Sequence, residues 1–500
     1  MAKTNIVFNN TNYTIDDSSL SAASATLRTH LSTVMNGTGA VINLGGTSYN
    51  IDSTKLSAAT NAFVSHLGTV AGGGYKVMVG GVEYGVDSGK MTRAVAEIEA
   101  VLGAFQEELG TPIYYSSLSS AIGDTTYTGD ADANSAKVNV YTNTETGHKT
   151  VLLREDIMLT ETLNVGDNIT LWLNGYEIVS AITPAIKTTG SNVIIDGNNA
   201  GSSITVNAPV DSTATVFNVQ SGKLTVNGGI YTASASGTGA TAIELADGAA
   251  LTITNASINS SDSNNGDAFG INAGENTTIV ADGCTIEAAS QTNLSVSAIN
   301  SYGNVKLTNS TILGNANYTA NEAGTNYASR SKGIMCYGNL ELNNCYVWGA
   351  HSGINSIGAL TIDGGTYEGY GHGGIYFSGD EANIRNAKIN WAEMKDGYVS
   401  DEVAGTNGAG MYVGATSNAN IYIDNCNFYG TLYGVVLRGS GGEENNMIYI
   451  SNSDMEFGRY SFRMSSYSSR VYIGTGNGFD KNTTSLAGNC IETTESYAQP

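Results

Sequence analysis

A repeat with two alternating phases, between about Val193 and Val471, constrains the fold more than any other feature of the sequence. In the first phase, every second residue is apolar over a short stretch, as in Leu251–Ile258. An Asn or Gly and then a small residue follow this stretch, and one more apolar residue ends the unit. In the second phase a small residue precedes an apolar one, as in Gly353-Ile354. Each first-phase unit is followed by a second-phase unit, which is the signature of a solenoid.

The alternation predicts strands with one buried face, separated by turns at which Asn or Gly adopts a positive φ. Such short strands cannot each build a core, whereas stacked coils bury one continuous core. The sequence therefore predicts a mainly β chain that folds as a parallel β-helix. A β-sandwich, the alternative, would show hairpin turns about every 8 to 12 residues and a single phase. The second-phase isoleucines should form one buried column: Ile271, Ile299, Ile334, Ile354 and Ile375.

A second, unrelated repeat occupies residues 1–105. Tyr13, Tyr49 and Tyr84 recur at nearly equal spacing, each in the second of two short apolar stretches separated by Asn-Asn or Gly-Gly. An aspartate (Asp16, Asp52 or Asp87) follows each stretch at the position of a helix N-cap, ahead of an apolar helical face. The pattern predicts three tandem ββα modules.

The remaining boundaries follow from these two repeats. Residues 106–150 form a transition, in which a short helix within 114–122 is expected to cap the open end of the solenoid. The β-helix itself is expected over 151–475, and residues 476–500 form a C-terminal tail.

Composition excludes several classes of function. The 62 glycines and 4 prolines suit stacked turns, and a formal charge of −23 without a basic cluster argues against a nucleic-acid partner. No signal region or long apolar segment is present, so we expect a protein made in the cytoplasm that does not insert into membranes. Cys284, Cys345 and Cys426 share one turn position and are interpreted as small buried residues, and no metal or cofactor is expected.

Two stretches resemble known families. Thr170–Ile178 resembles the L-x-L-N-G-x-x-I motif in the first coils of pectin-lyase-like proteins. This resemblance implies a right-handed, single-stranded parallel β-helix. The N-terminal triple repeat is similar to modules of bacteriophage virion surface proteins, of the head-decorating fibre or tailspike type. The resemblance implies a protein on the virion surface, attached through residues 1–105 to capsid or tail proteins. It also implies a homotrimer whose β-helix faces outward.

The candidate ligand site lies where loop lengths change. The long connections 313–333 and 390–410 flank two short ones, so in stacked coils they should border a notch. Aromatic rings stack on sugars and carboxylates bond their hydroxyls, so we expect a site for host or mucus polysaccharide. The same side chains are also typical of loops that cover neighbouring coils or a trimer partner. The notch residues are Trp348, His351, Glu368, Tyr370, His372 and Trp391, with Glu393 and Asp396 beside Trp391.

Three functions fit this sequence. The first is a non-enzymatic capsid decoration, head fibre or tail fibre of a phage that attaches to glycans through many weak contacts. The second is a tailspike depolymerase, either a glycoside hydrolase or a polysaccharide lyase, although no residue is assigned as catalytic. The third is a bacterial surface adhesin, which the missing signal region and wall-anchoring tail disfavour.

Overall fold

The structure is a computed structural model. It describes residues 112–479, except 144–145, 265, 291–294, 317–330, 370–372, 391–408, 415–417, 431–432, 438–444, 458–459 and 465–468. Within residues 1–111 it describes six strands only. The chain divides into two compact units, Met1–Thr150 and Val151–Pro500, and each is considered by itself.

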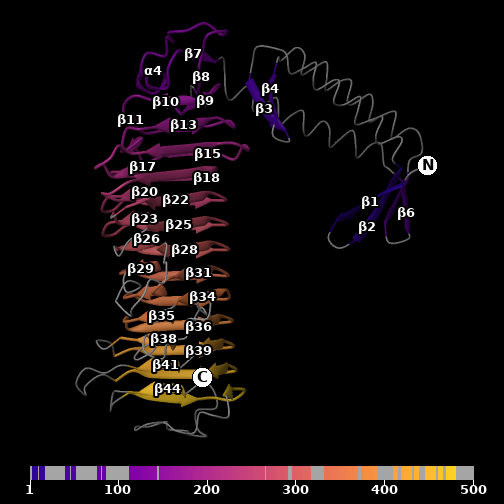
Figure 1. The fold of residues 1–500 in the computed structure, drawn as a ribbon. Coiled ribbons are helices and arrows are strands. Elements are labelled where there is room, and N and C mark those ends of the chain that lie inside the picture. The colour runs from indigo at the N-terminus through magenta and orange to yellow at the C-terminus, as the bar shows by residue number, and fades with distance from the viewer. Residues whose placement is uncertain are drawn as a thin grey trace. The chain divides into compact units, whose positions relative to one another are not determined.

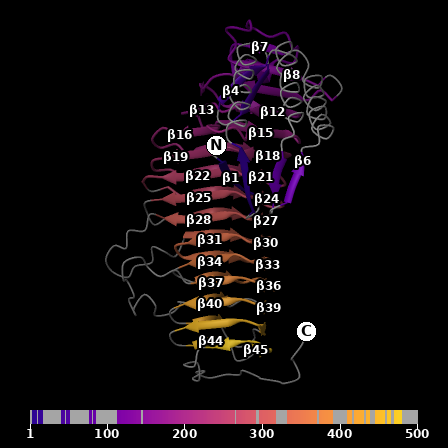
Figure 2. The same ribbon diagram turned by 90° about the vertical axis from the view of Figure 1, so that its right-hand side faces the viewer.

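Most of the described chain lies in three long sheets of stacked strands (Figure 1). Successive strands enter the first, second and third sheets in turn, so that three strands make one coil. Strands of neighbouring coils pair in parallel, as β31 pairs with β34. This arrangement is mainly β and parallel β-helix-like, as the two-phase repeat predicts. Figure 2 shows strands of the first and third sheets running side by side along the stack.

The first sheet has 13 strands. They are β10 (Ile157–Leu159), β13 (Glu177–Ser180), β16 (Ser203–Asn207), β19 (Ile230–Ala235), β22 (Ser257–Asp262), β25 (Thr285–Ser290), β28 (Thr311–Ala316), β31 (Tyr346–Gly349), β34 (Thr366–Gly369), β37 (Lys388–Asn390), β40 (Asn427–Gly430), β43 (Asp454–Phe457) and β46 (Gly478–Phe479).

The second sheet has 12 strands. They are β11 (Leu163–Val165), β14 (Ile186–Thr188), β17 (Ala214–Val219), β20 (Ala240–Leu245), β23 (Ala268–Ala273), β26 (Val296–Ser301), β29 (Ser331–Cys336), β32 (Ser352–Ser356), β35 (Gly373–Phe377), β38 (Ala409–Val413), β41 (Tyr433–Leu437) and β44 (Tyr460–Met464).

The third sheet has 15 strands, and its β7 and β8 pair antiparallel. In spatial order they are β45 (Arg470–Ile473), β42 (Met447–Ser451), β39 (Asn420–Asp424), β36 (Glu381–Arg385), β33 (Leu360–Asp363), β30 (Leu340–Asn343), β27 (Asn304–Thr308), β24 (Thr278–Asp282), β21 (Ala250–Thr254), β18 (Lys223–Gly228), β15 (Val193–Gly197), β12 (Ile169–Trp172), β9 (Lys149–Leu153), β8 (Val138–Thr142) and β7 (Ile113–Tyr115).

The core runs along the inside of the coils. The predicted isoleucine column is confirmed: Ile271 pairs with Ile299, and the series continues through Ile334 and Ile354 to Ile375, with every member buried. Apolar side chains from each coil thus stack on the same side chains of the next. This continuous burial is what the isolated strands could not supply.

The turns between the third and first sheets carry the expected asparagines. Their φ angles lie between 48° and 57°, a conformation that asparagine tolerates better than most residues. Their side chains also bond along the stack, since Asn344 Nδ2 donates to Asn309 Oδ1 at 3.1 Å and Asn425 Nδ2 donates to Asn386 Oδ1 at 2.8 Å. The asparagines of this turn are Asn255, Asn309, Asn344, Asn386, Asn425 and Asn452.

The cysteines at the next turn position are buried and unpaired, as predicted for Cys284, Cys345 and Cys426. Burial raises the pKa of the Cys426 thiol to about 11. A thiol with such a raised pKa stays protonated near neutral pH, so its role here is packing.

In the first unit, the structure describes three antiparallel hairpins within residues 1–85. They are formed by β1 (Lys3–Phe8) with β2 (Thr11–Asp16), β3 (Ala40–Leu44) with β4 (Thr47–Ile51), and β5 (Lys76–Val79) with β6 (Val82–Gly85). Two residues separate the strands of each hairpin, as the repeat predicts. The predicted helices lie outside the described residues, so the ββα modules stay a prediction.

The short helix expected within 114–122 is confirmed in part, because it begins later than predicted. Residues Ile113–Tyr115 form strand β7, and helix α4 spans only Leu118–Gly123. Ser117 is its N-cap, since its side chain accepts a hydrogen bond from the Ser120 backbone N–H. Tyr114 and Tyr115 therefore belong to a strand, in which Tyr115 is buried, and not to the helix. The capping role of residues 106–150 stays a prediction.

Candidate functional site

Two groups of outward-facing aromatic residues are candidates for a ligand site. The first is the predicted notch. Trp348 on β31 and Glu368 on β34 are register partners in adjacent coils, so the first sheet brings these two predicted residues together. Both side chains are half-buried. Leu313 on β28 is the partner of Trp348 on its other side, which extends the apolar surface by one coil.

Other side chains complete this patch. The Tyr346 hydroxyl donates to Glu368 Oε2 at 2.8 Å, and Tyr346 was not among the predicted site residues. His351 is half-buried at the bend before β32, and its backbone N–H donates to the Ser331 carbonyl at 2.8 Å. Tyr370, His372 and Trp391 lie outside the described residues, as do Glu393, Asp396 and most of both flanking loops. The notch as a whole therefore stays a prediction.

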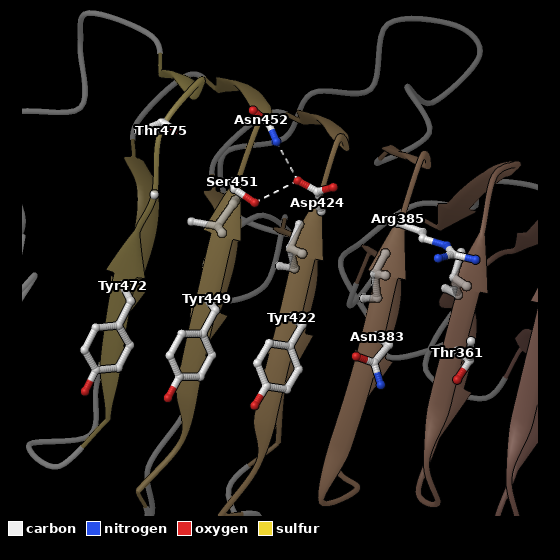
Figure 3. Close-up of a pocket in the computed structure, with 15 residues that line it drawn as sticks. Thr361, Asn383, Arg385, Tyr422, Asp424, Tyr449, Ser451, Asn452, Tyr472 and Thr475 are labelled. Carbon is white, nitrogen blue, oxygen red and sulfur yellow. Dashed lines mark hydrogen bonds between the residues drawn. The ribbon is translucent and has the colours of Figure 1, made fainter. Parts of the chain in front are cut away.

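The second group is a row of three tyrosines on the outer face of the third sheet. Tyr422, Tyr449 and Tyr472 occupy equivalent positions on β39, β42 and β45. Their ring centroids are 5.0 and 4.8 Å apart, with interplanar angles of 10° and 9°. Figure 3 shows the three rings side by side, with their hydroxyl groups pointing the same way. The parallel register of the strands produces this row, because it sets one ring above the next at the strand spacing.

The tyrosines line a groove with a volume of about 850 Å³, named here the tyrosine groove. Its lining comes from five neighbouring strands, β33, β36, β39, β42 and β45. Since neighbouring strands lie roughly 4.8 Å apart, the groove extends about 19 Å along the stack. Its outward-facing lining residues are Thr361, Asn383, Arg385, Tyr422, Asp424, Tyr449, Ser451, Asn452, Tyr472 and Thr475 (Figure 3).

The local sequence explains why these rings face outward. Ile421 and Ile423, which flank Tyr422, are buried, and the same alternation surrounds Tyr449. Because successive side chains of a strand point to opposite faces, the buried isoleucines fix each tyrosine on the solvent side. An apolar-Tyr-apolar motif recurs in the last three strands of the third sheet, and this motif was the sequence feature that could have predicted the row. In the predicted pattern of alternating apolar residues these positions are the unspecified ones, so the three tyrosines are not among the predicted site residues.

Polar groups lie along one end of the tyrosine rings. Asp424 Oδ1 accepts hydrogen bonds from Ser451 Oγ at 2.7 Å and from Asn452 Nδ2 at 2.8 Å, both on the next coil (Figure 3). These bonds hold the carboxylate in place beside the rings, and its second oxygen, Oδ2, offers an acceptor to a ligand. The phenol hydroxyls lie at the opposite end of the rings.

The charges in the groove nearly compensate each other. Arg385 Nη2 donates to Asp363 Oδ2 at 2.8 Å, in an exposed ion pair. The Asn386 amide and the Arg385 guanidinium hold the pKa of Asp363 below its usual range, so this carboxylate is charged near neutral pH. The positive charge of Arg385 is thereby balanced, and the Asp424 carboxylate remains as the charge beside the tyrosines.

The described residues include neither a metal-binding cluster nor a helix that could span a membrane. No group of three or more His, Cys, Asp or Glu side chains among the described residues is arranged to hold a metal ion. Within the same part of the chain, no helix has the length and apolar character that crossing a membrane requires.

No protein-family model, no curated protein and no solved structure matches this chain. The chemistry of the two aromatic groups therefore carries the functional argument. Ring surfaces flanked by hydroxyl, amide and carboxylate groups can bind a flat, partly apolar ligand that also carries hydroxyl groups. Sugars have this character, because one side of the ring presents C–H groups and the rim presents hydroxyls.

Proposed function

We propose that this chain is a structural, non-enzymatic protein of a bacteriophage virion surface, a capsid decoration, head fibre or tail fibre, that attaches the particle to host or mucus glycans. The tyrosine groove is the observation that carries the glycan-binding part of this proposal. The virion part rests on the resemblance of the N-terminal repeats and of the coil Thr170–Ile178 to such proteins. In this proposal the body is a right-handed, single-stranded β-helix and residues 1–105 are three ββα modules that join capsid or tail proteins.

The strength expected of such a site is modest. Stacking on one aromatic ring contributes about 0.5–1.5 kcal/mol, by analogy with aromatic pairs in proteins. The three tyrosines stack on one another, so a ligand meets their outer edges as one continuous row, and a homotrimer repeats this row. Many copies on one particle would then convert weak single-site binding into firm attachment, because the later contacts form at high effective concentration.

The patch of Tyr346, Trp348 and Glu368 is a second candidate contact for the same ligand class. The Glu368 carboxylate accepts a hydrogen bond from the Tyr346 hydroxyl, and Trp348 is the register partner of Glu368 on the neighbouring coil. It lies on the first sheet, whereas the tyrosine groove lies on the third. A polymer bound to one of them would not have to occupy the other, so each can be tested separately.

Binding is proposed here in preference to cleavage. Acid–base hydrolysis of a glycosidic bond commonly uses two carboxyl groups on either side of the bond. Among the described residues that line the tyrosine groove, Asp424 is the one carboxylate. Incubation of the protein with capsular and mucin polysaccharides tests this choice, since release of reducing or unsaturated ends would contradict it.

A glycan array tests the function directly. The full chain should bind a set of glycans, and the variant with Tyr422, Tyr449 and Tyr472 all changed to Ala should lose that binding while it keeps its strand content by circular dichroism. The matched control is Tyr302→Ala with Tyr337→Ala, which removes another exposed stacked pair, with centroids 4.2 Å apart, outside the groove. Absence of all glycan binding by the wild-type chain would refute the proposal. Electron microscopy of virions labelled at the N-terminus tests the location.

A further inference from the structure

We infer that the tyrosine groove binds a run of uncharged sugars whose chain lies parallel to the stacking axis of the strands. This inference rests on the function proposed above and adds to it the class of glycan and its direction. The direction follows from the spacing of the rings, and the class follows from the charges around them.

The direction comes from the way the rings repeat. The three centroids are 5.0 and 4.8 Å apart and the interplanar angles are 10° and 9°, so the rings stack on one another and form one continuous aromatic row along the axis. A glycan that crossed the sheet along a strand would meet a single tyrosine. A glycan that runs from β39 to β45 meets all three, and the groove continues past them to Thr361 on β33. Only the axial direction uses the whole groove.

The cross-section of the groove fits a sugar ring. The phenol hydroxyls form one polar edge, and Asp424, Ser451 and Asn452 form the other, with the aromatic rings between them (Figure 3). Because the stacked rings cover part of each other's faces, a sugar can place its C–H groups against the outer edges of the row and direct its hydroxyls to both polar edges. The Asp424 carboxylate accepts hydrogen bonds, and hydroxyl groups supply the donors that it needs.

The charges exclude polyanionic glycans. Arg385 is the one cation in the described lining of the groove, and it is bonded to Asp363, whose pKa is held low by Asn386 and by Arg385 itself. Asp424 adds a negative charge beside the rings, and the chain as a whole has a formal charge of −23. A sulfated or uronic-acid polymer would bring further negative charge to this surface and be repelled. Neutral sugars carry no charge and are not repelled in this way.

The experiment is a calorimetric titration of the full chain with neutral oligosaccharides, namely cello-, manno- and N-acetylglucosamine series from disaccharide to hexasaccharide, together with any neutral glycan found on the array. Oligogalacturonates and heparin fragments of equal length are the charged counterparts. Affinity should rise with each added neutral unit until the groove is full, and the charged series should bind at least about tenfold more weakly, which corresponds to about 1.4 kcal/mol.

Variants assign the contact to the rings. Tyr449→Ala interrupts the aromatic row and should lower the affinity for the longer neutral oligosaccharides by about two- to tenfold, the range expected for loss of one aromatic contact. Tyr449→Phe keeps the ring and should keep most of the affinity. The control pair Tyr302→Ala with Tyr337→Ala should leave the affinity unchanged.

The outcomes separate this inference from the proposed function. Binding that does not depend on length, or that prefers the charged series, would overturn the inference and leave glycan binding intact. A wild-type chain that binds no glycan in either experiment would overturn both. A triple Tyr→Ala variant that binds glycans normally but changes its sedimentation from trimer to monomer would show that the rings contact a second copy of the chain, and would also overturn the inference.

Discussion

The early and late coils of the third sheet have the same interior and different exteriors. Inward positions carry aliphatic side chains throughout, such as Val226 on β18 and Ile450 on β42. Outward positions of the early coils carry Thr225 and Thr252, which are register partners, whereas the late coils carry Tyr422, Tyr449 and Tyr472. Stability and the proposed ligand binding therefore depend on alternate residues of the same strands. The strand period of two lets one set change without disturbing the other.

The largest expected effect is on the inward set. Ile354→Ala removes a fully buried side chain from the middle of the isoleucine column, between Ile334 and Ile375. The loss of transfer free energy and the remaining cavity should lower the free energy of unfolding by about 2–5 kcal/mol. Val280→Ala, at an outward position that is 37% exposed, should change it by only about 0.5 kcal/mol. Equal effects in denaturant titrations would show that the inward and outward assignments are wrong.

A smaller loss is expected at a buried carboxylate that fixes the turns. Asp262 Oδ2 accepts from the N–H groups of Gly237 and Gly239, both at 3.0 Å, and Oδ1 accepts from those of Asn264 and Gly266, both at 2.9 Å. Asp262→Asn replaces one acceptor oxygen by a donor that faces two N–H groups, so about 1–3 kcal/mol should be lost.

The exposed Asp247 provides the control for this substitution. It makes a single backbone contact, to the Glu275 N–H at 2.8 Å, so Asp247→Asn should cost about 0.5 kcal/mol or less. Although burial raises the pKa of Asp262, its four backbone bonds together hold that pKa below the usual range. Its contribution is therefore present above the unfolded-state pKa and is lost as the pH falls through the folded-state pKa. A pH-independent difference between wild type and Asp262→Asn would contradict this assignment.

The opposite pH dependence is expected of an outward carboxylate on the second sheet. Burial raises the pKa of Glu244, and hydrogen bonds from Asn272 Nδ2 to both carboxylate oxygens, at 3.0 and 3.1 Å, lower it only in part. The folded state thus holds this proton more tightly than the unfolded state. Stability from Glu244 is full below the unfolded-state pKa and is lost as the pH rises through the folded-state pKa.

Glu244→Gln tests this expectation. The neutral side chain should remove the Glu244 part of the pH dependence, so the variant should gain stability relative to wild type near neutral pH and lose that gain as the solution becomes acidic. Thermal unfolding of both proteins across this pH range measures the difference. A gain that grows toward acidic pH would have the wrong sign for a buried carboxyl with a raised pKa.

The smallest effect on the body is expected from removal of the N-terminal repeats. A chain that begins at Pro112 keeps every described strand from β7 onward, so its thermal unfolding should match that of the full chain. Under the proposed function it should fail to join virus particles, because residues 1–105 are the attachment part. Incorporation of the truncated chain at normal copy number would refute that role.

The sequence by itself determined the coil register, the isoleucine column, the buried cysteines and the asparagine turns. Each of these depends on the local pattern, since a period of two fixes which side chains face inward and a positive φ selects Asn or Gly. It also placed Trp348 and Glu368 together, because only a short coil separates them.

The tertiary structure decided which outward residues meet. Tyr422, Tyr449 and Tyr472 lie in three different coils. Their rings meet only because β39, β42 and β45 pair in a register that places the three tyrosines at equivalent positions. The raised pKa of Glu244 and two of the four bonds of Asp262, those from Gly237 and Gly239, likewise depend on neighbours from adjacent coils. The burial and the electrostatic environment of a side chain depend on all the groups that surround it. In this fold the stacking of coils brings those groups together from distant parts of the sequence.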